Sequence, residues 1–505
     1  MKPRLRTKTG CLTCRQRRKK CDEIPPVCQG CKSTGQKCEW PTAEDLVDRR
    51  FASHCQSRHQ NMMVKSRPEQ VRNRDDNVFI VDKEANHDLV KVTLLQRRVL
   101  LSSEPAMAHG VMTRNLEIVI SRHFVDRYYG LLILPRCHSE FHNGWLTEII
   151  DLMASHKFLY YSVLACAASH IHLIDPCAQM QELALSYYSS AITKLSWLLT
   201  TPSQLEYHNG LLTSVILLNI HGCMGCGTYP DIPRHLNAAT NIITLRLLNS
   251  PTGIKGLFDI LAVESVLYHI FHVMTGLWSD LTEPDYHFDI DFWTRAETLL
   301  NRSTFFPRAS RSLNSPVLGV PVSLFRLALL LRQHCRNSFL LDTTDLEIMQ
   351  KEISGWETSL LCEQELQSAS GSNMGESDVQ EEYYRDASSL YAIIVSLLRK
   401  EMPRNEPGPP LEAGSGNWQV RKAIQILKKY EQDDGWARCF IGNWPTYTLG
   451  FFMSASEDKQ AIRADMQRRW DLTKLAQITR FSSDLENTWM TRQERGFATP
   501  GTLIQ

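Results

Sequence analysis

Apolar residues recur with the period of an α-helix over most of the chain beyond about residue 115. Most prolines and glycines lie between these runs, and few stretches alternate apolar and polar residues as a half-buried strand does. The pattern therefore predicts a mostly α fold, with a large all-α domain of stacked helices. The expected helices span residues 116–134, 157–174, 177–199, 211–220, 234–248, 254–275, 322–336, 342–361, 383–400 and 419–430.

The run at residues 157–174 is apolar nearly all round, which predicts a central, buried helix. A membrane span is the alternative, but the uncharged stretch is shorter than the roughly 20 residues that a span needs. The stretch also contains Ser162, Ser169, His170 and His172. We therefore expect no membrane association. The two histidines are two positions apart, so they point to different faces of a helix and form a poor ligand pair.

Polar stretches divide the chain into parts. Residues 41–112 read as a linker, partly disordered, with a possible short helix at 88–101 and no sustained heptad that would form a dimerising coiled coil. Two later segments, 363–386 and 403–417, are rich in acidic, Ser, Gly or Pro residues and are expected to be loops. The first is either a small acidic activation segment or a solvated loop. The predicted domains are residues 1–40, the linker 41–112 and the helical domain 113–505.

Charge is distributed unevenly between the two ends of the chain. The 505 residues contain 56 Lys and Arg against 55 Asp and Glu, a formal net charge of +1. Residues 1–40 contain 11 basic and 3 acidic residues, while residues 41–505 contain 45 and 52. A strongly basic head on an acidic body indicates that the head binds nucleic acid.

The same head contains six cysteines with the spacing C-x2-C-x6-C-x6-C-x2-C-x6-C, whose second trio repeats the first at an offset of 17 residues. Repeated CxxC pairs are typical of metal sites. Zinc in a structural site takes four ligands, so six thiolates serve two ions only if two are shared. The equivalent residues that open each half, Cys11 and Cys28, are the natural bridges. One ion would take Cys11, Cys14, Cys21 and Cys28, and the other Cys28, Cys31, Cys38 and Cys11.

The cysteines allow two other interpretations. A disulfide-rich module is disfavoured because the charged start of the chain has no apolar leader behind it, and intracellular thiols stay reduced. A RING or LIM module needs eight ligands, commonly including histidine, and the first histidine is His54.

Residues 10–40 closely resemble the fungal zinc binuclear cluster, Zn(II)2Cys6. Besides the cysteines, Arg15, Arg17, Lys20, Asp22 and Pro26 fall in register, and Arg18 departs from the Lys more usual there. The resemblance implies two structural zinc ions and a first helix whose end enters the major groove of double-stranded DNA and reads a CGG triplet. Arg17 and Arg18 would then contact bases, with Arg18 favoured, since a guanidinium bonds guanine O6 and N7 together. The implied phosphate contacts are Lys8, Arg15, Lys19 and Lys20.

The helical part resembles the fungal-specific transcription factor regulatory domain. The resemblance rests on residues 187–192 (YYSSAI), 235–239 (HLNAA) and the Asn443-Trp444-Pro445 segment up to Gly450. It implies a regulatory helical scaffold. Some relatives bind apolar small molecules in a helical pocket, so a small-molecule effector is one possible partner.

Other motifs add little chemistry. The segment 221–226 (HGCMGC) is either a further metal or redox pair or a glycine-closed helix end. No GxSxG, P-loop, GxGxxG or HExxH occurs, so we expect no enzyme. The favoured function is a nuclear, sequence-specific transcription factor of the RNA polymerase II type, with DNA, the transcription machinery and a second copy as expected partners. The alternatives are a zinc-dependent nonspecific nucleic-acid binder, and a ligand-sensing or enzymatic body addressed to DNA by the cluster.

Overall fold

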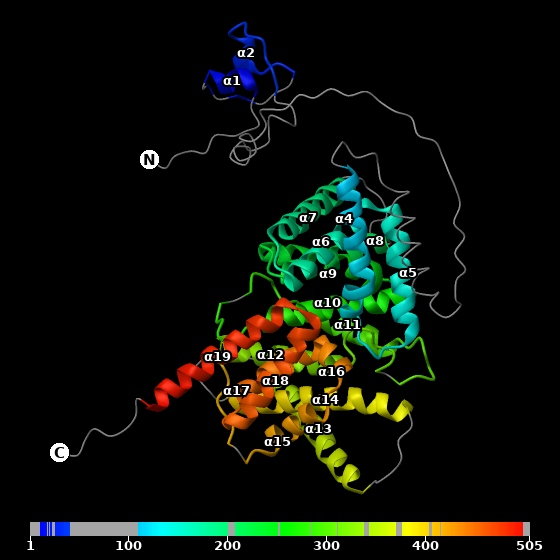
Figure 1. Ribbon diagram of the computed structural model, residues 1–505, viewed down its shortest axis with the longest axis vertical. Helices are drawn as coiled ribbons and strands as arrows, with labels where there is room; N and C mark the ends of the chain where they lie inside the picture. Colours follow the sequence, from blue (N-terminus) through cyan, green and yellow to red (C-terminus); the bar gives the residue numbers. More distant parts are fainter. Residues whose placement is uncertain are drawn as a thin grey trace, which may run out of the picture. The chain divides into compact units, whose positions relative to one another are not determined.

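The computed structural model of the protein describes residues 11–17, 19, 21–22, 26–40, 110–199, 208–250, 253–282, 284–310, 312–337, 343–369, 376–402, 407–414 and 416–497. The chain divides into two compact units, residues 1–81 and 82–505 (Figure 1). The first unit contains two short helices, α1 (Leu12–Gln16) and α2 (Gln29–Lys32). The expected helix at 88–101 and the linker without a coiled coil lie outside the described residues.

The second unit is built from α-helices joined by short turns, and no strand occurs in its described residues. The expected all-α body is therefore confirmed. Its helices are α4 (Gly110–His123), α5 (Ser139–Ser155), α6 (Lys157–Ile174), α7 (Ala178–Leu199), α8 (Asn209–Cys223), α9 (Ile232–Ile243), α10 (Leu257–Thr275), α11 (Ile290–Arg302), α12 (Val322–Asn337), α13 (Thr343–Ala369), α14 (Glu376–Glu401), α15 (Trp418–Lys429), α16 (Asp434–Arg438), α17 (Asn443–Phe451), α18 (Ser456–Thr473) and α19 (Ala476–Phe497).

Helix α6 is the centre of the first group of helices. It packs against α4, α5, α7 and α8 (Figure 1). Side chains on nearly all of its faces are buried. A helix without a polar face must be covered on every side, which explains the weak amphipathicity of this segment. The predicted central, buried helix at 157–174 is confirmed.

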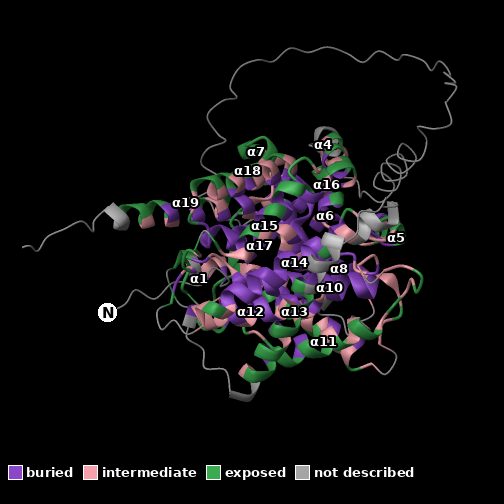
Figure 2. Ribbon diagram, turned by 90° about the horizontal axis from the view of Figure 1, so that it is seen from below, coloured by how far each residue is buried: buried purple, intermediate pink, exposed green. Residues whose placement is uncertain are grey.

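Helix α10 connects this group to the second one. It packs against α8 and α9 on one side and α12 on the other, while α12, α13, α14 and α15 form a further stack. Helices α17, α18 and α19 pack on one another and, through α17, on α14. The buried residues concentrate along α8, α10, α12 and α14 in the interior (Figure 2).

One described helix, α10, is long and apolar enough to cross a membrane, with a mean hydropathy of 1.5. However, 83% of that stretch is buried among the other helices. Its apolar surface is therefore used by the protein core. By length and hydropathy, α10 rather than the segment 157–174 is the candidate for a membrane span among the described helices. Both helices lie in the protein core.

Several predicted boundaries were wrong. The helix expected at 116–134 ends at His123 and continues as a π-helical turn, Phe124–Tyr128, and a 3-10 turn, Tyr129–Leu131. The helix expected at 234–248 likewise becomes π-helical at Thr244–Leu248.

The prediction of a loop at 363–386 was also wrong. Helix α13 continues to Ala369 and α14 begins at Glu376. The Glu and Gln residues of this segment are good helix formers, so their polarity did not exclude a helix. The loop at 403–417 is irregular wherever it is described.

Candidate metal centre and DNA-binding module

The two CxxC pairs open the two short helices in the same way. Cys28 precedes α2, and its Sγ accepts a hydrogen bond from the backbone N–H of Cys31 at 3.3 Å. Cys11 precedes α1, and its Sγ accepts from the N–H of Cys14 at 3.4 Å. The duplication at an offset of 17 residues is therefore a structural one. In each half the first helical turn delivers two sulfurs to the same side.

The end of the second half returns to the first helix. The backbone N–H of Leu12 donates to Glu39 O at 2.6 Å, and Thr13 Oγ1 donates to Lys37 O at 2.7 Å. Between these residues, Cys38 Sγ accepts from the N–H of Cys28 at 3.4 Å. These bonds place Cys38 beside the two cysteines that open the halves.

The six sulfurs form two groups of four. Cys11, Cys14, Cys21 and Cys28 make one group, Cys11, Cys28, Cys31 and Cys38 make the other, and all sulfurs of a group lie within 4.8 Å of one another. Cys11 and Cys28 are shared, as the ligand count predicts, and their sulfurs are 3.7 Å apart. Tetrahedral zinc with Zn–S bonds of about 2.3 Å has S···S edges of about 3.8 Å. The Cys14–Cys28 and Cys11–Cys31 separations of 3.6 and 3.7 Å fit this geometry.

Burial and mutual hydrogen bonds shift the pKa values of these thiols in opposite directions. Burial and hydrogen bonds to the Cys28 and Cys11 thiols raise the pKa of Cys14 to about 12. Burial alone would raise the pKa of Cys11 and Cys28, but N–H and thiol donors outweigh it and lower both. The module on its own therefore keeps some thiols protonated. Zinc binding, which requires thiolates, releases those protons.

Asp22 and Pro26, both in register with the zinc-cluster family, have structural contacts. Asp22 Oδ2 accepts from the N–H of Gln29 at 2.9 Å, at the first turn of α2, where a carboxylate is favourable. Pro26 O accepts from Trp40 Nε1 at 2.9 Å. Trp40 is also the apolar side chain that packs beside the cysteines. These two contacts hold the connection between the halves.

The basic residues expected to bind DNA are described only in part. Arg17 and Lys19 are exposed at the end of α1. Arg17 Nη1 donates to Thr34 Oγ1 at 2.8 Å, and Thr34 is the residue equivalent to Arg17 in the second half. Arg15 lies on α1. Lys8, Arg18 and Lys20 lie outside the described residues, so the DNA contacts stay a prediction.

Candidate motifs in the body have structural roles. His221 is buried, and its Nδ1 pairs with Thr228 Oγ1 at 2.8 Å. Gly225 and Gly227, at φ of +80° and +87°, end the helix that contains Cys223. No further group of three potential metal ligands is found in the described part of the body. The segment 221–226 thus ends a helix with glycines, and it belongs to no group of three potential ligands among the described residues.

The histidines at 170 and 172 point apart, as predicted. The buried His170 donates from Nε2 to Thr473 O and pairs through Nδ1 with His123, both at 2.9 Å. His172 instead accepts from the N–H of Cys177 at 3.1 Å. Burial and the neighbouring His170 lower the pKa of His123 to about 4, so this pair is neutral at physiological pH.

Two protein families match the two units. The fungal Zn(2)-Cys(6) binuclear cluster domain matches residues 9–45, and the fungal specific transcription factor domain matches residues 119–496. The second match covers most of the chain, so the protein belongs to the fungal-specific transcription factor family. The zinc cluster domain holds two zinc ions with six cysteines, and the sulfur geometry described above fits that cofactor.

Curated relatives match mainly through the cysteine-rich module. Transcriptional regulatory protein moc3 of Schizosaccharomyces pombe is 65% identical over 34 residues, 7% of each chain. Transcriptional regulatory protein pro1 of Neurospora crassa is 60% identical over 35 residues, 7% of this chain and 5% of that one. C6 finger domain transcription factor hasF of Aspergillus fumigatus is 37% identical over 73 residues, 14% of this chain and 10% of its own. The chain thus spans 5–10% of the length of these three relatives.

Proposed function

We propose that the protein is a zinc-dependent, sequence-specific DNA-binding transcription factor that acts in the nucleus. The observation that carries the proposal is the pair of four-sulfur groups that share Cys11 and Cys28 within a strongly basic segment. With two zinc ions in these groups, all four positions around each ion are taken by sulfur, so none is open for a substrate. Zinc then supplies folding energy, and the protein surface binds DNA.

The proposed DNA-binding residues are Lys8 and the basic residues of the segment 15–20. Arg17 and Arg18 contact guanines of a CGG triplet, and Lys8, Arg15, Lys19 and Lys20 neutralise phosphates. The hydrogen bond from Arg17 to Thr34 occupies one guanidinium nitrogen and leaves the others for DNA. The bond holds Arg17 in place and still lets it contact DNA, while Arg18 is proposed as the main base-reading residue.

The module proposed for DNA binding is residues 1–40, joined through a linker, 41–112, to the regulatory body, 113–505. The body acts without catalysis, through contacts with the transcription machinery, with a second copy of the chain or with an effector. Its acidic excess, 45 basic against 52 acidic residues over 41–505, keeps it from adding to the attraction of DNA.

A binding selection tests this function. The zinc-loaded full chain is incubated with a random pool of DNA duplexes, and the retained sequences are read. We expect enrichment of CGG triplets, whose number and spacing report a monomer or a dimer. Retention of the pool without any enriched sequence would support the nonspecific binder instead. Arg18→Ala should relax the triplet preference, whereas Lys19→Ala should weaken all sequences uniformly and reduce the salt dependence.

A further inference from the structure

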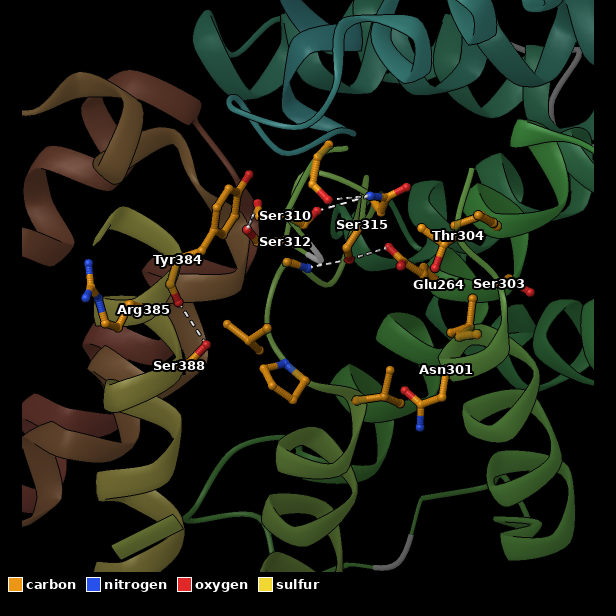
Figure 3. A pocket seen from close by; sticks show the side chains of 18 residues that line it. Glu264, Asn301, Ser303, Thr304, Ser310, Ser312, Ser315, Tyr384, Arg385 and Ser388 are labelled. Atoms are coloured by element: carbon orange, nitrogen blue, oxygen red, sulfur yellow. Dashed lines mark hydrogen bonds between the residues drawn. The ribbon is translucent and has the colours of Figure 1, made fainter. Parts of the chain in front are cut away.

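A hollow of about 660 Å³ lies in the body, between α10, α11, α14 and the loop that precedes α12 (Figure 3). Its size falls in the range of small-molecule sites. Polar side chains dominate the labelled part of its wall, and they come from all four elements. Apolar side chains such as Ile260, Leu300 and Val322 line the hollow as well, so its wall is mixed, unlike the apolar pocket that the family resemblance suggests.

Glu264 of α10 faces this hollow with one oxygen free. Its side chain is 4% exposed, and Oε2 accepts from Ser315 Oγ and from the N–H groups of Val317 and Leu318 at 2.9, 2.8 and 3.0 Å. Oε1 has no hydrogen bond, and Glu264 forms no ion pair with any described residue. A buried carboxylate is normally paired with a cation, because its desolvation is otherwise uncompensated. None of the described residues supplies such a cation to Glu264, and its charge is offset by the three donors to Oε2.

Tyr384 of α14 is the second unsatisfied group. Its side chain is 2% exposed, and its hydroxyl is buried without a hydrogen-bond partner. Gly319 holds it in place: at φ of +65°, a Cβ on this glycine would lie 2.8 Å from the Tyr384 ring and 2.6 Å from Leu134. The backbone at Gly319 therefore approaches the Tyr384 ring as closely as a glycine permits.

Two further hydroxyls of the wall present acceptors rather than donors. Ser303 Oγ donates to Leu299 O, and Ser388 Oγ donates to Tyr384 O, both at 2.8 Å, so their lone pairs are left for a ligand. The basic residue among the described wall residues is Arg385, which is exposed and points away from the hollow in Figure 3. An acceptor-rich wall around an unpaired carboxylate selects a positively charged hydrogen-bond donor.

We propose that this hollow is a binding site for a small organic amine, whose ammonium group pairs with Glu264 Oε1. An ammonium group has three N–H donors, and Oε1 and the serine lone pairs are acceptors of the kind it needs. The bound cation would keep Glu264 ionised, although burial raises the pKa of this carboxyl to about 7 in the free protein. A ligand here would connect α10, α11 and α14.

Isothermal titration of the full chain tests the proposal with three matched probes in 0.15 M salt at pH 7.5. These are 1,4-diaminobutane, 4-amino-1-butanol and the neutral 1,4-butanediol. We expect one saturable site for both amines and at least tenfold weaker binding of the diol. Glu264→Gln keeps an oxygen for the 315–318 loop but places an amide donor toward the hollow, so it should weaken both amines at least tenfold. Glu457→Gln, an equal charge change at an exposed position of α18, should leave affinity within twofold.

A second variant keeps the proposal testable if Glu264→Gln fails to fold. Ser388→Leu fills the hollow without touching Glu264 and should also abolish amine binding, with the helical circular dichroism spectrum unchanged. The proposal is overturned by the absence of saturable binding of either amine to the wild type, or by diol binding equal to that of the amines. Equal losses in Glu457→Gln and Glu264→Gln would likewise overturn it, since they would indicate general attraction to an acidic body. DNA selection is independent of all these outcomes.

Discussion

Cys28→Ala should remove both zinc ions from the N-terminal module, since its sulfur belongs to both four-sulfur groups. Structural zinc contributes on the order of 10–16 kcal/mol to the folding of small modules at neutral pH. Apart from the cysteines themselves, the apolar side chain packed in this cluster is the half-buried Trp40. Full burial of one large apolar side chain is worth roughly 3 kcal/mol at most. The remaining contacts therefore cannot compensate for the metal, and the module should unfold.

The assay combines zinc content with DNA affinity. We expect inductively coupled plasma mass spectrometry to find two zinc ions in the wild type and none in Cys28→Ala. Fluorescence anisotropy with a selected duplex should show affinity lowered at least 100-fold. Cys177→Ala, at an exposed body cysteine outside both sulfur groups, is the matched control and should behave as the wild type. Normal DNA affinity of Cys28→Ala would refute the reasoning, because it would show that the module folds without its shared ligand.

Three further predictions concern the body, each measured by denaturant unfolding of the purified chain. Burial raises the pKa of Glu264 from its ordinary value of 4.5 to about 7 in the folded protein. Wild-type stability should therefore fall as pH rises from about 4.5 to 7, and Glu264→Gln should be about 3 kcal/mol more stable than wild type at pH 8 but not at pH 4.5. A pH-independent difference would contradict this. Gly319→Ala should lower the free energy of unfolding by about 1–3 kcal/mol, because residue 319 has a φ of +65° and the new Cβ would lie 2.6 Å from Leu134. An unchanged denaturation midpoint would argue against tight packing at this position. Arg469→Leu should lower the free energy of unfolding by about 3–5 kcal/mol, since Asp465, which lies 2.5 Å from Arg469 Nε in the wild type, loses its partner. A loss below 1 kcal/mol would show that water can take the place of the arginine.

Helix α18 was not predicted from the sequence, and it shows why apolar periodicity alone can fail to indicate a helix. Helix α18 buries Ile462, Met466, Arg469 and Thr473, which follow helical spacing, but two of the four are polar. Arg469 is buried because it donates to Asp465 and to the carbonyl oxygen of Cys439, a residue 30 positions away. Only the folded chain brings that carbonyl to the arginine. A period of apolar residues therefore could not indicate this helix.

The sequence by itself determined the metal chemistry. The spacing of six cysteines and their 17-residue repeat predicted two sulfur groups that share Cys11 and Cys28, and the structure brings together those groups. The reason is physical: each CxxC is one helical turn, so local geometry alone places its two sulfurs side by side. Long apolar runs such as 157–174 were predicted for a similar reason, since a helix without a polar face has to be buried.

Only the tertiary structure decided the chemistry of the body. Glu264 and Tyr384 are 120 positions apart in the chain, and neither stands in a motif. Their significance depends on the partners that each lacks: the free Oε1 of Glu264 and the unpaired hydroxyl of Tyr384 become visible once α10, α14 and the 303–320 loop are packed together. Whether a buried polar group is satisfied is a property of its whole surroundings, and a linear sequence does not contain those surroundings.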